Sequence, residues 1–105
     1  MKYYFVGELN VIDREWAQDY IANVTPMVER YGGRFLARTN TIERLEGKRQ
    51  NPHVILIIEW PSQESALAFY KSEEYQPLLK NRLAGSVGDL VLVAGEDINK
   101  VACIA

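Results

Sequence analysis

The sequence of 105 residues contains one cysteine and one histidine. The single cysteine, Cys103, excludes an internal disulfide and a thiolate-cluster metal site, and no His or basic residue near it would activate the thiol. The chain also lacks a nucleophile-elbow motif and a glycine-rich phosphate loop. Around its one histidine, the sequence shows no Ser-His-Asp arrangement of a serine hydrolase. We therefore expect an unreactive Cys103, no metal site and no cofactor.

Long runs of like charge are also missing. Twelve Lys and Arg stand against fourteen Asp and Glu, which gives a formal net charge of −2. Because neither sign gathers into a patch that would hold phosphates, nucleic acid is not an expected partner. The apolar stretch Tyr3 to Val6 ends at Gly7, far short of a membrane span of roughly 20 residues. We expect a cytoplasmic protein that does not enter a membrane.

The length and the hydrophobic fraction of 48% are sufficient for one core. We assign a single domain to residues 1–96 and a mildly apolar tail to residues 97–105, which could pack on a partner subunit.

Secondary structure follows from the spacing of apolar residues and from turn residues. Residues 2–9, 34–40, 53–60 and 87–94 read as strands. Residues 14–31 have the three-and-four apolar spacing of a helix, with Asp13 as its N-cap and Gly32-Gly33 as its end. Ser62 and Ser72 are expected to cap two further helical segments. Residues 41–52 are expected to be the remainder of a hairpin with an exposed, charged tip at residues 46–49. The order β-α-β-β-α-β predicts an α+β, ferredoxin-like protomer: a four-stranded antiparallel sheet with its helices on one face.

The strands carry apolar residues on both of their faces. Residues 54–60 place Val54, Leu56 and Ile58 on one face but Ile55 and Ile57 on the other, because side chains alternate along a strand. The helices can cover only one face of the sheet. A homodimer, in which two sheets pack face to face, would bury the second face and close an apolar pocket at its rim.

Several segments together resemble the domain-of-unknown-function 1330 (DUF1330) family. They are YGGRFLAR (31–38), LEG (45–47), IEWPS (58–62), AFY (68–70) and SEEYQPL (72–78), with Arg82. The resemblance implies a dimeric α+β barrel, a group that includes cofactor-free monooxygenases, dehalogenation- or isomerisation-like enzymes and stress-responsive barrels. Trp60 departs from the pattern, because phenylalanine is expected there.

Glu59 is the candidate catalytic residue. A carboxylate at the end of a strand buried on both faces needs a cation or several donors, or its pKa must rise. It can line a pocket, lie at the wet rim or pair with a structural arginine such as Arg82 or Arg38. His53 cannot act as its partner, because six residues of strand separate the two by about 20 Å.

The other candidate ligand-binding residues are two arginines and a cluster of hydroxyls. Arg82 follows the apolar stripe of its helix and can snorkel, pair with Glu59 or hold an anion. Arg38 shares a predicted strand face with Arg34, and this face is expected to line either the pocket or the solvent-exposed surface. Tyr70, Ser72 and Tyr75 can bind an anion or donate a proton, although Ser72 is also explained as a cap and Tyr70 as a core ring.

These observations predict a protein that binds a small, partly apolar organic molecule, which can be anionic. As an enzyme it would act without a cofactor, with Glu59, a tyrosine and an arginine as proton carrier, donor and anion clamp. The alternative is a non-catalytic ligand-binding or structural, stress-related dimer module.

Overall fold

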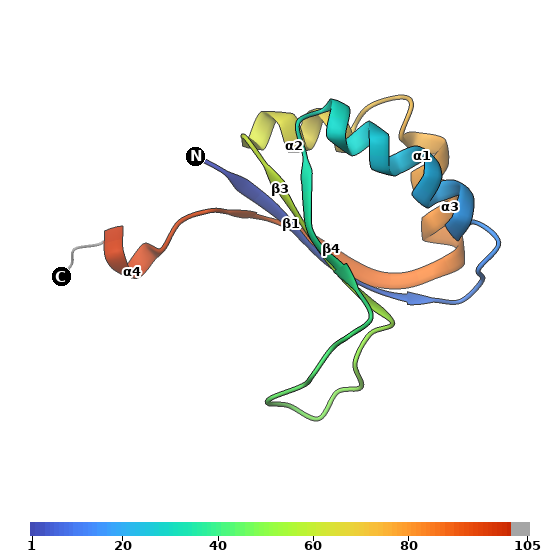
Figure 1. The fold of residues 1–105 in the computed structure, drawn as a ribbon, viewed down its shortest axis with the longest axis horizontal. Coiled ribbons are helices and arrows are strands. Elements are labelled where there is room, and N and C mark those ends of the chain that lie inside the picture. Colours follow the sequence, from blue (N-terminus) through green and yellow to red (C-terminus); the bar gives the residue numbers. More distant parts are fainter. Residues whose placement is uncertain (102–105) are drawn as a thin grey trace.

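The computed structural model describes residues 1–101 (Figure 1). The elements follow in the order β1 (Tyr3–Val11), α1 (Ala17–Arg30), β2 (Arg34–Thr39), β3 (Val54–Trp60), α2 (Gln63–Tyr70), α3 (Gln76–Gly85), β4 (Ser86–Ala94) and α4 (Ile98–Val101). The strands form one antiparallel sheet in the order β2-β3-β1-β4. The predicted α+β, ferredoxin-like protomer is confirmed. Cys103 lies outside the described residues.

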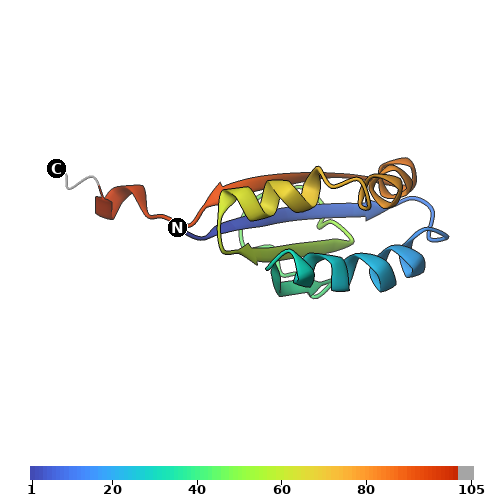
Figure 2. The ribbon, with the colours of Figure 1, turned by 90° about the horizontal axis from the view of Figure 1, so that it is seen from above.

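All three long helices cover the same face of the sheet (Figure 1). Figure 2 shows α1 along the β2–β3 side and α2 and α3 along the β1–β4 side. The core between these layers is rich in aromatic rings: Trp60, fully buried, packs edge-on against Phe5 at 5.1 Å and stacks on Phe69 at 5.4 Å. Such ring pairs stabilise beyond their buried area. These contacts fix the sheet against α2, and Phe5 and Phe69 also line the cavity described below.

The two glycines after α1 end the helix as predicted. Gly32 adopts a φ of 92°, a conformation that glycine adopts without a Cβ penalty. The N–H of Gly33 then donates back to the carbonyl of Val28 at 2.9 Å, which satisfies one of the last helical carbonyls. Ser62 also caps α2 as predicted, because its hydroxyl accepts from the N–H of Ser65.

The other two predicted caps are wrong. Asp13 accepts a hydrogen bond from the N–H of Glu15 in the turn before α1, and the helix begins later, at Ala17 with Trp16 as its cap. Ser72 donates from Oγ to the carbonyl of Phe69 at 2.8 Å, so its hydroxyl closes the end of α2 instead of opening α3. Both residues find a nearer backbone partner, a competition that short polar side chains often face.

The sheet face away from the helices, called the open face below, is uncovered in the protomer. Strand pairing places on it Tyr4, Val6 and Glu8 of β1, Ile55, Ile57 and Glu59 of β3, and Val91 and Val93 of β4. Val6, Val91 and Val93 are 37%, 52% and 40% exposed. The expectation that apolar residues occupy both faces is therefore confirmed.

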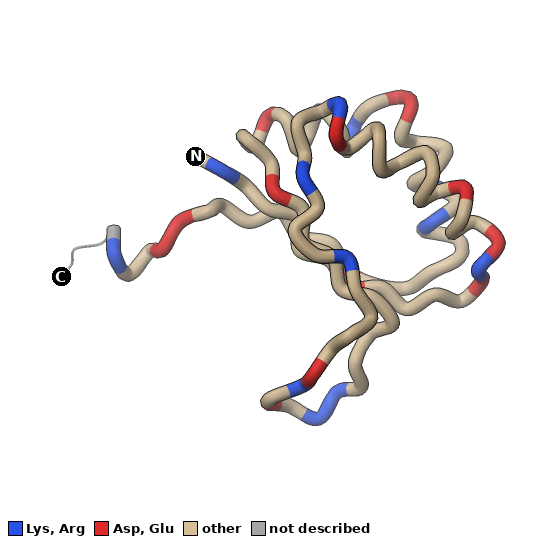
Figure 3. The backbone as a smooth tube through the Cα atoms, in the orientation of Figure 1, with Lys and Arg blue, Asp and Glu red and all other residues tan. Residues whose placement is uncertain are grey.

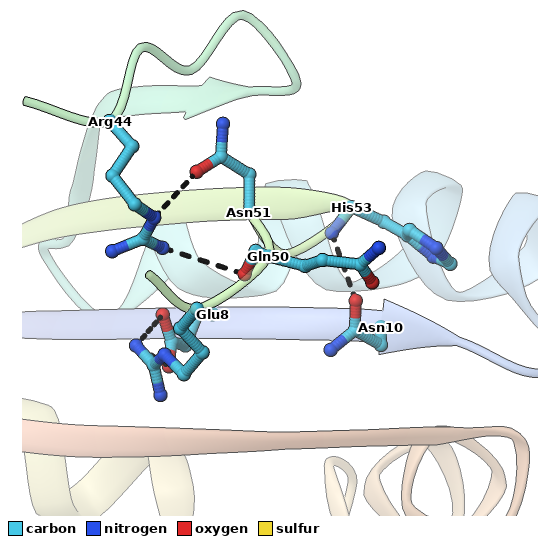
Figure 4. Close-up of polar contacts among 7 residues, drawn as sticks. Glu8, Asn10, Arg44, Gln50, Asn51 and His53 are labelled. Carbon is cyan, nitrogen blue, oxygen red and sulfur yellow. Dashed lines mark hydrogen bonds and ion pairs between the residues drawn. The ribbon is translucent and has the colours of Figure 1, made fainter. Parts of the chain in front are cut away.

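Residues 40–53 form a long loop that joins β2 to β3 and projects away from the helices (Figure 1). Side chains hold it in shape: Arg44 donates from Nε to Oδ1 of Asn51 at 3.1 Å, and the N–H of His53 donates to Oδ1 of Asn10 at 3.2 Å (Figure 4). Arg49 pairs with Glu8 of the open face at 3.1 Å. The loop 40–53 thus projects on the side of the open face and is held to it by this ion pair.

Candidate ligand-binding site

A cavity of about 430 Å³ lies between the helical layer and the sheet, under α1 and α3. Its walls are mainly apolar, with Phe5, Leu9, Val24, Val28, Leu56 and Leu90 among them. Gly7 contributes to the floor, where a Cβ would come within 2.9 Å of Cδ1 of Leu90. The missing side chain at Gly7 therefore helps to keep this space open.

Arg82 is the buried cation of the cavity. It belongs to the inner face of α3 with Leu79, and its residue is only 9% exposed. No carboxylate within residues 1–101 forms an ion pair with its guanidinium. Its Nε donates to the hydroxyl oxygen of Tyr20 at 3.2 Å. A buried arginine without a carboxylate partner is energetically costly, which makes Arg82 the leading candidate for an anion-binding group.

Two tyrosines complete the polar end of the cavity. The hydroxyls of Tyr20 on α1 and Tyr75 before α3 lie 2.5 Å apart, and both residues line the cavity. Burial, and after it the proximity of Tyr75, raises the pKa of Tyr20 far above its usual value, so Tyr20 is a neutral phenol near neutral pH. Burial tends to lower the pKa of Arg82, but the oxygens of Tyr20 and Tyr75 raise it. The net shift of the pKa is upward, so the arginine stays charged.

Arg38 reaches the cavity because of an irregularity in β2. Arg34 lies opposite Glu59 on the open face, but a bulge between Phe35 and Ala37 shifts the register, so that Arg38 lies opposite Leu56 on the helix side. The prediction that Arg34 and Arg38 share a strand face is wrong, because the extra residue of a bulge reverses the alternation. Arg38 donates to Oγ1 of Thr25 at 2.9 Å, and its guanidinium lies 3.9 Å from the ring centre of Phe35.

Glu59 lies on the open face and not in the cavity. Its carboxylate contacts Nζ of Lys2 at 3.0 Å, Nη2 of Arg34 at 3.6 Å and the hydroxyl of Tyr4 at 3.4 Å. The hydrogen bond from Lys2 is the main cause that holds the pKa of Glu59 below its ordinary value. The structure therefore places Glu59 with two surface cations, Lys2 just before β1 and Arg34 of β2, and away from the cavity.

Tyr70 and Ser72 also lie outside the cavity lining. The ring of Tyr70 packs edge-on against Phe5 at 6.2 Å, and Ser72 is engaged with the backbone of α2. Of the six residues predicted to bind a ligand, the structure brings together Arg38, Tyr75 and Arg82 at the cavity, and places Glu59, Tyr70 and Ser72 elsewhere.

Sequence reasoning missed Tyr20, which it counted only as part of an apolar helix face. The signal that could have found it is the spacing Trp16–Tyr20, four residues apart and thus on one side of a helix. In the structure these rings meet edge-on at 5.3 Å, and Nε1 of Trp16 donates to the carbonyl of Gly85 at 3.1 Å. The indole N–H of Trp16 and the hydroxyl of Tyr20 each need a hydrogen-bond partner when buried, which is the signal that this side of the helix meets polar groups.

No group of three or more His, Cys, Asp or Glu within residues 1–101 could hold a metal ion. His53 is exposed and accepts from the N–H of Val11 through Nδ1 at 2.9 Å, which ties the loop 40–53 to β1. Lys and Arg are interspersed with Asp and Glu along the described part of the chain (Figure 3). No helix within the described part of the chain is long and apolar enough to cross a membrane.

The sequence matches the family described as "Domain of unknown function (DUF1330)" over residues 2–96. The chain belongs to the DUF1330 family. No curated protein matches it. Similar solved structures include the RPA0582 protein of unknown function from Rhodopseudomonas palustris, with a TM-score of 0.78, 17% identity and coverage of 91% of this chain and 83% of that one.

Two further similar structures come from proteins with a described activity. SnoaB, a cofactor-independent oxygenase from Streptomyces nogalater, has a TM-score of 0.65 and 16% identity, over 91% of this chain and 94% of that one. An antibiotic biosynthesis monooxygenase has a TM-score of 0.51 and 17% identity, over 92% and 100% of the two chains. At these identities the likeness shows a shared α+β fold.

Proposed function

We propose that this DUF1330 protein is a homodimer that binds a small, partly apolar organic anion in the cavity between its helices and sheet. The observation that carries the proposal is Arg82, a buried cation without a carboxylate partner among the described residues, at the end of an apolar cavity of about 430 Å³. Ligand sites are typically concave, mainly apolar and supplied with a few converging polar groups. Tyr75 and Arg38 supply the other groups predicted from the sequence.

The chemistry that fits this site is cofactor-independent conversion of an organic substrate that ionises readily. Arg82 and the phenols can stabilise a negative charge that develops on the substrate. Because its pKa is raised, Tyr20 stays protonated near neutral pH and cannot accept a proton as a base. Glu8 and Asp89 contribute to the lining, but strand alternation directs their side chains to the open face. A substrate with an acidic proton of its own therefore fits better than one that needs a strong base.

The alternative function is a non-catalytic ligand-binding or structural, stress-related dimer module. It is favoured by the position of Glu59, the predicted proton carrier, on the open face beside Lys2 and Arg34. In this alternative, Glu59 serves the dimer, and the cavity only stores or senses its ligand.

The homodimer is supported by the apolar open face and by the loop 40–53 at its edge, which would reach past the sheet of a second copy. We also propose that the tail from residue 97 packs on the partner, because α4 extends away from the body of the protomer (Figure 1). A cytoplasmic location stays a prediction from the sequence.

Native mass spectrometry of protein purified from its own host tests these proposals together. We expect a dimer that retains a discrete small molecule, and loss of that extra mass in Arg82→Gln. A monomer at micromolar concentration would contradict the dimer. A bare wild-type dimer, whose melting temperature no small carboxylate or phenol raises, would contradict the ligand site. If NMR shows a bound compound to remain unchanged over many hours, the non-catalytic alternative holds.

A further inference from the structure

We infer that Arg82, Tyr20 and Tyr75 form a donor-only site for one organic oxyanion, in which Tyr20 is a positioning residue and Tyr75 and Arg82 contact the ligand. The inference rests on the proposed ligand cavity and names the chemical class that the cavity takes. A phenolate, an enolate or an aromatic carboxylate shares this chemistry.

The hydrogen bonds at the two phenols determine which hydroxyl hydrogen is free for a ligand. The oxygen of Tyr20 accepts the Nε hydrogen of Arg82 at 3.2 Å, and the Tyr20 and Tyr75 hydroxyls share one further hydrogen across 2.5 Å. Two hydroxyls own two hydrogens, so one remains available. If Tyr20 donates to Tyr75, the free hydrogen is that of Tyr75. Because Arg82 already draws electron density from Tyr20, this direction makes Tyr20 the better donor.

The guanidinium adds only further donors. Arginine has five N–H groups and no acceptor, and one of the five is used on Tyr20. The backbone carbonyl of Arg82 accepts from Oγ of Ser86, so that hydroxyl is engaged along the helix end. The polar end of the cavity therefore offers several hydrogens and a positive charge, and the complementary ligand group is an oxygen with negative charge.

The remaining charged residues of the lining do not cancel this preference. Arg38 is a second cation, held by Thr25 at 2.9 Å. Glu8 and Asp89 lie opposite one another on β1 and β4, on the open-face side, and Glu8 is paired with Arg49 at 3.1 Å. The field inside the cavity is thus set by the two arginines.

The walls indicate the body of the ligand. Phe5, Phe35, Phe69 and Trp16 contribute aromatic rings to a cavity of about 430 Å³. Ligand pockets span roughly 300–1,000 Å³, so this cavity suits a small molecule from the lower part of that range. The class is therefore a ring-sized compound with one oxyanion, and its ring lies among these aromatic residues while its oxygen meets Tyr75 and Arg82.

The probe for this class is 4-nitrophenol, whose phenolate absorbs in the visible range and whose neutral form does not. A site that prefers the anion lowers the pKa of the bound probe, so the visible band appears on binding at a pH below the solution pKa of the probe. We expect Tyr20→Phe to weaken binding by about tenfold and to reduce the phenolate fraction of the bound probe. We expect Arg82→Gln to weaken binding by about a hundredfold and to abolish the band, and Arg82→Lys to restore part of it.

Tyr31→Phe is the matched control, because Tyr31 packs against Phe69 but does not line the cavity. It should bind and ionise the probe as the wild type does. A bound but neutral probe, or a band unchanged in folded Tyr20→Phe, would overturn the inference. Benzoate distinguishes the sources: if it competes with 4-nitrophenol, carboxylates share the site, and if it does not, the site takes phenolates and enolates alone.

4-Nitrotoluene separates failure of this inference from failure of the proposed function. It has the same ring but no ionisable hydroxyl. If 4-nitrotoluene raises the melting temperature as much as 4-nitrophenol does, the cavity binds ligands but has no preference for an oxyanion. If neither compound nor benzoate binds to the folded protein, both the inference and the proposed ligand site fail.

Discussion

Arg82 donates from Nε to the hydroxyl oxygen of Tyr20 at 3.2 Å, although 62 residues separate them in the sequence. The contact joins α3 to α1 across the top of the cavity. It satisfies one of the five N–H groups of a guanidinium that has no carboxylate partner among the described residues. Such an arrangement lowers stability, and under the proposed function it keeps a positive charge available for the ligand.

Arg82→Met tests whether Arg82 serves the fold or a ligand. Replacement of an unpaired buried charge by an apolar side chain of similar length removes a desolvation penalty, so the free energy of unfolding should stay unchanged or rise by about 1 kcal/mol. Urea denaturation of the unliganded protein measures the change. A loss of more than about 2 kcal/mol would assign Arg82 a structural role.

The raised pKa of Tyr20 predicts a loss of stability in alkali. The folded state keeps the proton that the unfolded chain releases near the ordinary value of 10.0, so the contribution of Tyr20 is complete below that pH and declines as the pH rises further. The slope should be about 1.4 kcal/mol of unfolding free energy per pH unit for this group. Urea denaturation above pH 10 should show a shallower decline for Tyr20→Phe; equal declines would contradict the assignment.

The lowered pKa of Glu59 predicts a loss of stability in acid. Its pKa is lowered in the folded state, chiefly by the hydrogen bond from Lys2, so its stabilising contribution is present above the ordinary value of 4.5 and declines as the pH falls toward the folded value. An NMR titration should place the Glu59 carboxyl below that ordinary value. Lys2→Gln should move it back upward, and added salt should have the same effect because the pair is near the surface. No response to either change would exclude the pairing.

Gly33 predicts a steric coupling with Trp60. A Cβ at Gly33 would lie 2.6 Å from Cγ1 of Val28 and 2.9 Å from Cη2 of Trp60. Gly33→Ala should lower the free energy of unfolding by about 1–3 kcal/mol, because this core has no room to yield. Trp60→Phe removes one of the two obstructing groups, so the double variant should be at least about 0.5 kcal/mol more stable than additive costs predict. A strictly additive cycle would show that the two residues are not in contact.

The exposed valines of the open face indicate where a single charge would break the proposed dimer. Val91→Lys places a cation on this face beside Val6 of the neighbouring strand, and light scattering should then give the chain mass of 12.0 kDa in place of twice that mass. Leu83→Lys is the matched control, because Leu83 is 60% exposed on α3, away from the open face. It should stay dimeric. Dissociation by both variants, or by neither, would point to another interface.

The sequence alone determined the order of the elements, the end of α1 at Gly32-Gly33, the cap at Ser62 and the apolar residues on both sheet faces. These features depend on near neighbours: alternation along a strand, helical spacing and backbone freedom are set within a few residues. The resemblance to DUF1330 was likewise readable in short segments, and the family match over residues 2–96 confirms it.

Only the tertiary structure decided which polar residues meet. One extra residue in β2 sent Arg38 to the cavity and left Arg34 beside Glu59, and a bulge cannot be read from alternation because it breaks the alternation. Tyr20 joined Arg82 and Tyr75 only when α1 and α3 packed side by side, 55 and 62 residues apart in the sequence. Hydrogen-bond partners at such separations depend on the register and packing of the whole domain, which no local pattern of residues specifies.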